Sequence, residues 1–279
     1  MLLDLYTEEE LFIAKDLILT LNIGAYDQYQ SETPRGILLG GQPASGKTAL
    51  MRNIRQEFNE VKFIVINGDE YRQFHPRAKK ISETFGQDAP KYTQAFSNAL
   101  VEHLKAECLR SRCNFIIEGT MRSFDVIQKT AQQIKQAGFY CEAHVLAIHR
   151  NDSWLGIFQR FEGDKQRTGI GRFSPVEVHD EAYRQIPVNL NRAQKEGLFD
   201  RIAIYTRLLT DGLTLTVNWL AHYKPEIDFI SEFNRLRVPL LHNDFYRQQW
   251  LAIKLLAEKR GETNAGYLRL IDEFMALYS

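Results

Sequence analysis

One loop of the sequence could hold a phosphate group, because residues 41–48 read GQPASGKT. Gly41, Gly46, Lys47 and Thr48 fit the phosphate-binding pattern G-x-x-x-x-G-K-[ST] without a mismatch. Between the two glycines the backbone must curl so that successive N–H groups point at one anion. Lys47 can neutralise the β- and γ-phosphates of a nucleotide, and the Thr48 hydroxyl can ligate Mg²⁺. The residues expected to bind the nucleoside triphosphate are Gly41, Gln42, Pro43, Ala44, Ser45, Gly46, Lys47 and Thr48.

Carboxylates follow two further apolar runs of the chain. Asp69 comes just after the run 63–66, FIVI, and Glu118 lies in the run 114–120, NFIIEGT. The carboxyl ends of parallel strands meet at one edge of a sheet, and ligands bind at that edge. One of the two carboxylates could therefore accept the proton of an acceptor hydroxyl. The side chains expected at the same edge as the phosphate loop are Asp69, Glu118, Thr120 and Arg122.

Arginines follow in a segment rich in glycine. A helix expected over 153–161, ending near Glu162 and Gly163, presents Arg160. The segment that starts at Gly163, GDKQRTGIGRFSP, carries Arg167 and Arg172. This composition suits a mobile lid that supplies guanidinium groups to phosphates, because an arginine can bind a phosphate through two parallel hydrogen bonds.

These candidate residues require a framework of alternating strands and helices. Thr7 and Glu10 form a capping box that opens a helix, in which Leu11, Ala14, Ile18 and Leu21 would share one face. A loop over the site is expected at 74–91. The expected strands are 36–40, 63–66, 114–120, 141–148 and, as the last of the sheet, 201–205. The expected helices after the phosphate-loop helix are 92–109, 125–137, 153–161 and 176–195. This alternation predicts an α/β fold with a doubly wound, mainly parallel sheet flanked by helices.

The chain divides into three parts on this reading. Residues 1–33 would form an N-terminal helical extension, 34–207 the phosphate-binding core, and 208–279 a helical C-terminal appendage of two or three helices. The appendage is expected to pack on the core, because apolar and aromatic residues are scattered through it.

The composition narrows the class of protein. The 279 residues include 35 basic and 35 acidic side chains, so no net charge directs the chain toward nucleic acid or an anionic membrane. The three cysteines, Cys108, Cys113 and Cys141, form no C-x-x-C pair, and we expect them to be reduced and mostly buried. Neither a signal peptide nor a membrane-spanning apolar run is evident, so a cytoplasmic location is expected.

The motifs also favour one class of phosphate-loop protein. A small GTPase would need an Asn-Lys-x-Asp sequence downstream, and the chain contains none. A motor or RecA-like ATPase would usually place an aspartate directly at the end of an apolar strand and act on a polymer. Two separate carboxylates followed by an arginine-rich segment suit a kinase of a small molecule instead.

Seven segments of the chain, within residues 34–207, together resemble the zeta toxin family of bacterial toxin–antitoxin systems. They are GGQPASGKT, NGDEYRQFHP, IIEGTMR, SWLGIFQRFE, GRFSP, IPVNL and GLFDRIAIY. The resemblance implies a P-loop kinase-like fold and a kinase that uses ATP and Mg²⁺. It implies phosphorylation of the 3′-hydroxyl of the amino sugar in UDP-N-acetylglucosamine, which blocks cell-wall synthesis. A nucleotide sugar and an antitoxin protein would then be the partners.

The resemblance also implies a role for each matching residue. Lys47 would bind phosphate, Thr48 would lie beside the metal, and Asp69 would be the general base. The residues that would hold the substrate are Glu118, Thr120 and Arg122, and those that would clamp the transferring phosphate are Arg160 and Arg172. Ala44 departs from the family pattern, which has glycine at that position, and would be tolerated there with a negative φ.

Two other functions remain open on the sequence. The chain could be a P-loop kinase of another small metabolite, such as NAD, or a nucleotide-binding regulatory module without catalysis. Asp69 argues against the regulatory module, because a protein that only binds a nucleotide has no use for a carboxylate beside the γ-phosphate.

Overall fold

The structure, a computed structural model, describes residues 3–23, 28–59, 61–169, 171, 173–210, 214–221 and 227–278. Its strands are β1 (Arg35–Gly40), β2 (Ile64–Asn67), β3 (Phe115–Glu118), β4 (Tyr140–Leu146), β5 (Arg201–Thr210) and β6 (Thr214–Ala221). Its first helices are α1 (Glu8–Ile23), α2 (Lys47–Glu57), α3 (Gly68–Tyr71), α4 (Ala78–Phe85), α5 (Ala89–Arg110) and α6 (Phe124–Gln136). The later helices are α7 (Arg150–Thr168), α8 (Val176–Lys195), α9 (Phe229–Leu236), α10 (Asn243–Lys259) and α11 (Ala265–Ala276).

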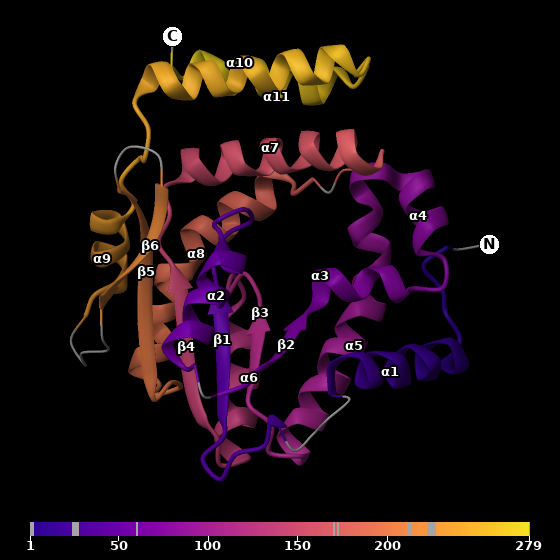
Figure 1. The fold of residues 1–279 in the computed structure, drawn as a ribbon, viewed down its shortest axis with the longest axis vertical. Helices are drawn as coiled ribbons and strands as arrows, with labels where there is room; N and C mark the ends of the chain where they lie inside the picture. Colours follow the sequence, from indigo (N-terminus) through magenta and orange to yellow (C-terminus); the bar gives the residue numbers. More distant parts are fainter. Residues whose placement is uncertain are drawn as a thin grey trace.

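The described strands form one sheet in the order β2-β3-β1-β4-β5-β6. The first five strands pair in parallel, and β6 pairs antiparallel with β5. Helices cover both faces of this sheet, which confirms the predicted doubly wound, mainly parallel α/β fold (Figure 1). Strands β1, β2 and β3 are short and mostly apolar, as expected for strands that are buried on both faces.

Side chains alternate between two apolar cores, one on each face of the sheet. Ile37 and Leu39 of β1 pack with Leu50 and Ile54 of α2 in the smaller core. Leu38, between them, points to the other face and joins the larger core, which contains residues of α1, α5, α6 and α8. The period of two along β1 therefore decides which of its side chains pack against α2, the helix that follows the phosphate loop.

Helix α1 packs on α5 beside the sheet (Figure 1). The predicted capping box is confirmed, since the Thr7 N–H donates to Glu10 Oε2 at 2.8 Å and the Glu10 N–H donates to Thr7 Oγ1 at 3.1 Å. Leu11, Ala14 and Ile18 are buried as expected. The prediction for Leu21 was wrong, because its side chain is 62% exposed.

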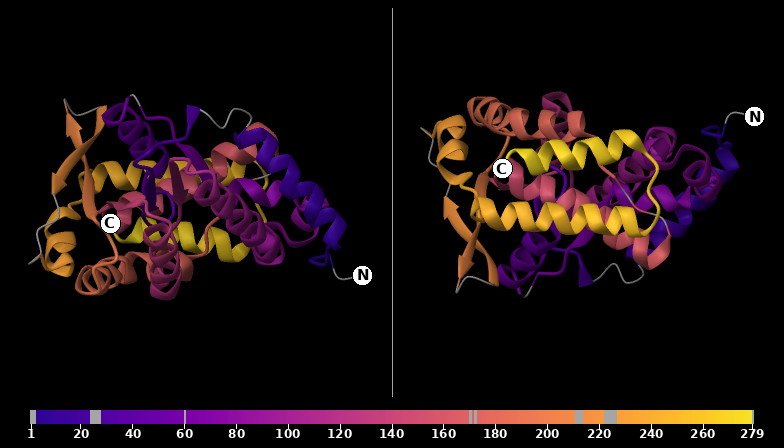
Figure 2. Two further views of the ribbon diagram at one scale, coloured as in Figure 1. Left: turned by 90° about the horizontal axis from the view of Figure 1, so that it is seen from below. Right: turned by 90° about the horizontal axis from the view of Figure 1, so that it is seen from above.

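A third apolar cluster lies above the sheet, where α7 crosses the upper end of the parallel strands. Helices α10 and α11 run side by side and lie on α7 (Figures 1 and 2). Trp154 and Phe158 of α7 pack there against Trp250 of α10 and Tyr267 of α11. The C-terminal helices therefore bury one face of α7, as expected for an appendage that packs on the core.

Several predicted segments differ from the structure. The last sheet strand was predicted at 201–205, but β5 continues to Thr210 and β6 follows within the region expected to be helical. The loop expected at 74–91 contains α4, and α5 begins at Ala89 instead of Tyr92. The helix expected to end near 162–163 continues to Thr168. The division of the chain at residues 33 and 207 stays a prediction.

The cysteines agree with the expectation from the sequence. Cys108, Cys113 and Cys141 are all free and buried. Burial raises the pKa of each thiol above its ordinary value, so these groups stay protonated near neutral pH. Among the helices in the described ranges, none combines the length and the apolar character that crossing a bilayer requires.

Candidate active site

The phosphate loop joins β1 to α2, as the sequence pattern predicts. Gly46 immediately precedes α2 and has a φ of 99°, a left-handed conformation that glycine adopts without steric cost. The Lys47 ammonium donates to the Gly41 carbonyl oxygen at 3.0 Å and to the Gln42 carbonyl oxygen at 3.3 Å. Lys47 therefore lies across its own loop, where a phosphate oxygen could replace either carbonyl.

Ala44 corrects one expectation from the sequence. A negative φ was expected at this position, but the φ of Ala44 is 58°. The left-handed region costs an alanine roughly 1 kcal/mol or more, because Cβ approaches the following carbonyl oxygen. The position therefore retains the backbone conformation that favours glycine, although the residue is alanine.

Buried polar contacts anchor the start of the loop. Gln42 is fully buried, and its side-chain amide donates to the Ile148 carbonyl oxygen at 2.8 Å and to Ser153 Oγ at 3.3 Å. Ser153 Oγ in turn lies 2.8 Å from His179 Nε2 of α8. Burial lowers the pKa of His179, which favours the neutral ring. These contacts tie the phosphate loop to the first turns of α7 and α8.

Asp69 lies in the first turn of α3, directly after β2, where the sequence placed it. The side chain of Asn67 caps this turn by accepting the Asp69 N–H at 3.0 Å. The Asp69 carboxylate is half exposed and accepts from Arg72 Nε at 3.1 Å. Arg72 is fixed in turn by its bond to the Pro90 carbonyl oxygen at 2.7 Å. Asp69 is thus oriented, yet it remains open to a ligand.

Glu118 ends β3 at the same level of the sheet. Asn67 and Glu118 are partners in the parallel ladder, and the Asn67 amide donates to Glu118 Oε2 at 3.2 Å. The following turn is held by Asn189 of α8, which donates to the carbonyl oxygens of Met121 and Arg122 at 3.0 and 2.9 Å. These contacts hold the backbone of the turn that carries the predicted substrate residues.

The guanidinium of Arg122 is partly exposed and pairs with Glu181 across 3.0 Å. An exposed ion pair of this kind contributes little to stability and can exchange its partner for an anionic ligand.

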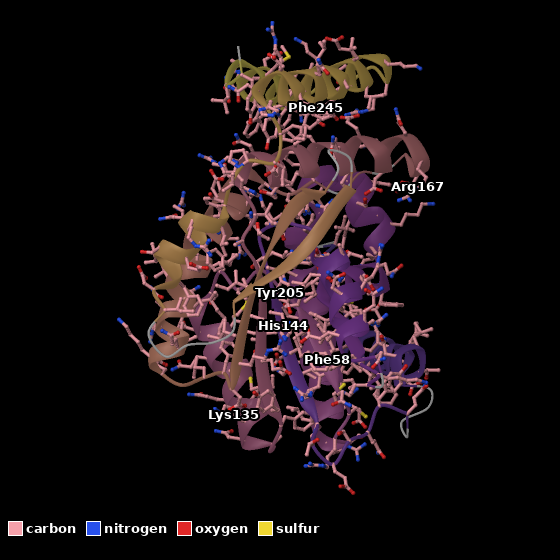
Figure 3. All side chains as sticks on the ribbon, turned by 60° about the vertical axis from the view of Figure 1, so that its left-hand side comes forward. Phe58, Lys135, His144, Arg167, Tyr205 and Phe245 are labelled. Carbon is pink, nitrogen blue, oxygen red and sulfur yellow. The ribbon has the colours of Figure 1, made fainter. Side chains whose placement is uncertain are left out.

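Arg160 and Arg167 both lie on α7. Arg160 is half buried and donates to Ser174 Oγ at 3.3 Å. The placement of Arg167 in a lid loop was wrong, because α7 continues past it to Thr168. The helix is capped by Gly169, which has a φ of 76°. Arg167 lies near the outer end of α7 and pairs with Asp164 (Figure 3). Arg172 lies outside the described residues, so its predicted role stays a prediction.

A cavity of about 520 Å³ opens between these elements. Its lining includes Pro43 of the phosphate loop, Asp69 and Arg72 of the β2 edge, and Thr120 and Arg122 of the β3 turn. Ser174, the partner of Arg160, also lines it. Lys47, Glu118 and Arg160 do not line this cavity themselves.

An adjoining cavity of about 440 Å³ shares Asp69 and Arg72 with the first. It also meets Asp164 and Arg167 of α7. Asp69 therefore borders both cavities.

Three contributors to the site were missed by the sequence reasoning. Asn67 and Arg72 hold the two carboxylates, and Arg207 of β5 touches the phosphate loop. Arg72 could have been found, because an arginine three residues after an aspartate lies on the same helical face. Arg207 gives a weaker signal, as a charged residue just after the apolar run 202–205.

Thr48 is the one residue that the sequence predicts as a ligand of the metal ion. It is the second residue of α2, and it is exposed. The hydroxyl oxygen and the carboxylates at the strand ends are hard donors of the kind that Mg²⁺ prefers. Within the described ranges, no group of three or more His, Cys, Asp or Glu side chains could hold a metal ion by itself. The donor set fits Mg²⁺, which commonly takes only one or two protein ligands and completes its shell with phosphate oxygens and water.

Fold and site together define a P-loop kinase-like protein, since a phosphate loop, oriented carboxylates and arginines meet at the carboxyl edge of a parallel sheet. The family model described as Zeta toxin matches residues 23–212. The chain therefore belongs to the zeta toxin family.

Relatives agree with this assignment. The chain is 35% identical to "Toxin zeta" of Enterococcus hirae over 179 residues, which are 63% of this chain and 62% of the relative. It is 34% identical to "Toxin PezT" of Streptococcus pneumoniae over 178 residues, which are 63% of this chain and 70% of the relative. The matching region thus spans less than two thirds of the length of the Enterococcus relative.

Solved structures show the same fold. A chain from the PezAT chromosomal toxin–antitoxin system of Streptococcus pneumoniae superposes with a TM-score of 0.74 and 25% identity, over 94% of this chain and 100% of that chain. The AvrRxo1-ORF1:-ORF2 structure with ATP gives a TM-score of 0.55 at 13% identity, over 99% of this chain and 84% of that chain. The second likeness concerns the fold alone.

Proposed function

We propose that this protein is a kinase that transfers the γ-phosphate of ATP to the 3′-hydroxyl of the amino sugar in UDP-N-acetylglucosamine, and so blocks cell-wall synthesis. One observation carries the proposal: Asp69, Thr120 and Arg122 line one cavity together with Pro43 of the phosphate loop. A nucleotide on the loop and an acceptor in the cavity would then meet at the Asp69 carboxylate. Membership of the zeta toxin family supports this choice of activity.

The phosphate loop would bind the triphosphate of ATP. The backbone N–H groups at the start of α2 and the positive end of its dipole favour an anion there. Lys47 would leave the carbonyl oxygens of Gly41 and Gln42 and bind the β- and γ-phosphates. The Thr48 hydroxyl would hold Mg²⁺, which neutralises charge on the phosphate oxygens when it is bound.

Asp69 would act as the general base. Its carboxylate takes the proton of the acceptor hydroxyl, and the hydroxyl oxygen forms a bond to the γ-phosphorus while the bond to the β,γ-bridging oxygen breaks. ADP then leaves with the electron pair of that bond. The Asn67 cap and the Arg72 ion pair fix the carboxylate before the substrate arrives, which reduces the entropy lost on reaching the transition state.

Arginines would stabilise the charge that moves during transfer. Arg160 donates to Ser174, which lines the cavity, and Arg172 follows in the segment between α7 and α8. Guanidinium groups beside the transferring phosphoryl group provide electrostatic stabilisation without further reorganisation.

The β3 turn would bind the acceptor. Glu118 and Thr120 offer a carboxylate and a hydroxyl to sugar hydroxyls, and Arg122 can exchange Glu181 for a phosphate of the nucleotide sugar. The partner that restrains the enzyme would be an antitoxin protein, in line with the likeness to the PezAT toxin–antitoxin system.

An acceptor panel tests the proposal. The purified protein is incubated with Mg-ATP and, separately, with UDP-N-acetylglucosamine, UDP-glucose, NAD and no acceptor, and products are read by mass spectrometry. The expected result is the mass of one added phosphate on UDP-N-acetylglucosamine only, formed far more slowly by Asp69→Asn. Phosphate on NAD or another metabolite would show that this molecule, and not UDP-N-acetylglucosamine, is the acceptor. Nucleotide binding without any transfer would indicate a regulatory module.

A further inference from the structure

Arg207 is a largely buried cation beside the phosphate loop. It lies on β5, and its Nη2 donates to the Ala44 carbonyl oxygen at 3.4 Å. Burial lowers the pKa of this guanidinium, and the charge of Asp152 partly offsets that effect. Removing a charged group from water costs free energy unless the group is paired. The buried position of Arg207 therefore needs a compensating gain in free energy elsewhere.

The guanidinium also lies directly against Gly46. A Cβ atom at position 46 would come within 2.2 Å of Arg207 Nη2 and 3.0 Å of its Cζ. Any side chain at position 46 would therefore displace Arg207, in addition to opposing the left-handed backbone there. Arg207 thus packs on the last loop residue before the phosphate-binding lysine.

The hydrogen bond from Arg207 fixes the peptide that follows Ala44, the residue with the strained left-handed backbone. The Ala44 carbonyl and the Ser45 N–H belong to one rigid peptide plane, and the Ser45 N–H donates to the Gln42 carbonyl oxygen at 3.1 Å. Arg207 holds one side of this plane and Gln42 holds the other. Together they hold Ala44 in the left-handed conformation that the loop needs.

Residues from the C-terminal part of the chain donate hydrogen bonds to Asp152, whose negative charge opposes the positive charge of Arg207. Asp152, in the first turn of α7, is 7% exposed. Its Oδ1 accepts a hydrogen bond from the hydroxyl of Tyr246 on α10, and its Oδ2 accepts from the Leu240 N–H at 3.3 Å. Tyr246 is itself fixed by stacking on Tyr278, with ring centroids 4.9 Å apart.

We infer that Arg207 is a positioning residue for nucleotide binding, which presets the tip of the phosphate loop for the triphosphate, and that the charge of Asp152, itself bound by Tyr246, supports Arg207 in this role. This inference rests on the proposed ATP-binding function. It extends the nucleotide site to Tyr246, which lies beyond the residues 23–212 matched by the family model. A residue on the C-terminal helices then tunes the affinity for nucleotide without touching it.

Binding of Mg-ATP and thermal midpoints test the inference in the full chain. The variants are Arg207→Met, Arg207→Lys and Tyr246→Phe. The control is Arg235→Met on α9, where the arginine side chain is 62% exposed and paired with Glu232. Arg207→Met should weaken Mg-ATP binding about tenfold or more, the effect of losing one charge-assisted hydrogen bond. Arg207→Lys should restore part of the affinity, and Tyr246→Phe should weaken binding by about two- to fivefold.

Kinetics separate positioning from chemistry and from general damage to the fold. For Arg207→Lys and Tyr246→Phe, KM for ATP should rise while kcat stays within about twofold of the wild type, because the loop recovers its conformation once ATP is bound. Arg235→Met should change neither value. If Arg207→Met does not fold, the two milder variants give the answer. Wild-type affinity for Mg-ATP in both variants would overturn the role inferred for Arg207 and leave the proposed function standing. A wild-type protein that binds no nucleotide would overturn the proposed function as well.

Discussion

Gly156 of α7 lies directly against Ala44 of the phosphate loop. A methyl group at position 156 would come within 3.2 Å of Ala44 Cβ and 3.4 Å of the Ala44 carbonyl oxygen. The contact is tight because Ala44 carries a side chain where its φ of 58° favours glycine. A larger side chain at position 156 of α7 would therefore crowd Ala44 of the phosphate loop.

Substitutions at these two positions should be coupled. Gly156→Ala gains helix propensity of about 0.5–1 kcal/mol but crowds Ala44, so alone it should change the free energy of unfolding little. In the Ala44→Gly background the crowding is relieved, and Gly156→Ala should be more favourable by about 0.5–1 kcal/mol. Chemical denaturation of the wild type, both single variants and the double variant measures this coupling. Strict additivity would show that the contact carries no energy.

Lys47→Ala should abolish phosphoryl transfer, because the developing charge on the phosphates would lose its closest cation. The fold should tolerate the change, since the bonds of the lysine ammonium to the Gly41 and Gln42 carbonyl oxygens lie within its own loop. Turnover and the thermal midpoint should be measured on the same preparation. Wild-type turnover by folded Lys47→Ala protein would remove Lys47 from the mechanism.

Local sequence patterns predicted the residues whose partners are near in the chain. The capping box of Thr7 and Glu10 and the position of Asp69 after a buried strand follow from neighbours within a few residues. Arg207 was missed, because its partner Ala44 lies 163 positions away and no local pattern encodes that contact.

The length of α7 shows how tertiary contacts can override a local signal. Gly163 was expected to end the helix, yet the preceding Glu162 accepts from Arg260 Nε at 2.8 Å and from the Tyr267 hydroxyl at 2.6 Å. These bonds and the aromatic cluster around Phe161 hold α7 against α10 and α11. Their combined energy exceeds the cost of roughly 1 kcal/mol for a glycine inside a helix.

Arg160 and Arg172 should differ in their effects on stability. Arg160→Ala should lower the rate of transfer by roughly 10³-fold and also lower the thermal midpoint, because the side chain is half buried and bonded to Ser174. Arg172→Ala should lower the rate with little change in the midpoint. Lysine at either position should restore only part of the rate, because an ammonium cannot form the bidentate fork. Unimpaired turnover in either alanine variant would exclude that arginine from the site.

Stability should fall as the pH is lowered below about 6.5, the ordinary histidine value. Burial lowers the pKa of His75, His103, His149 and His179 in the folded protein. The unfolded chain therefore binds protons that the folded protein does not, which favours unfolding as the pH falls through the unfolded-state value toward the folded ones. Thermal midpoints between pH 7.5 and pH 5.5 should decrease, and less steeply in His179→Gln than in a control variant of the exposed His242. A midpoint that rises toward pH 5.5 would contradict this expectation.

The proposed role of Asp69 is tested most directly by comparing Asp69→Asn with the wild type in two assays on the same protein, Mg-ATP affinity and the rate of phosphoryl transfer to UDP-N-acetylglucosamine. An amide of the same shape cannot accept the hydroxyl proton, and general-base assistance typically contributes about 10²- to 10⁴-fold to the rate. The rate should therefore fall by that factor, while the affinity for Mg-ATP stays within about twofold of the wild type, because Asp69 follows β2 and is not part of the phosphate loop. A variant that lost its affinity for ATP but transferred phosphate at the wild-type rate once saturated would show that Asp69 binds the nucleotide and is not the base.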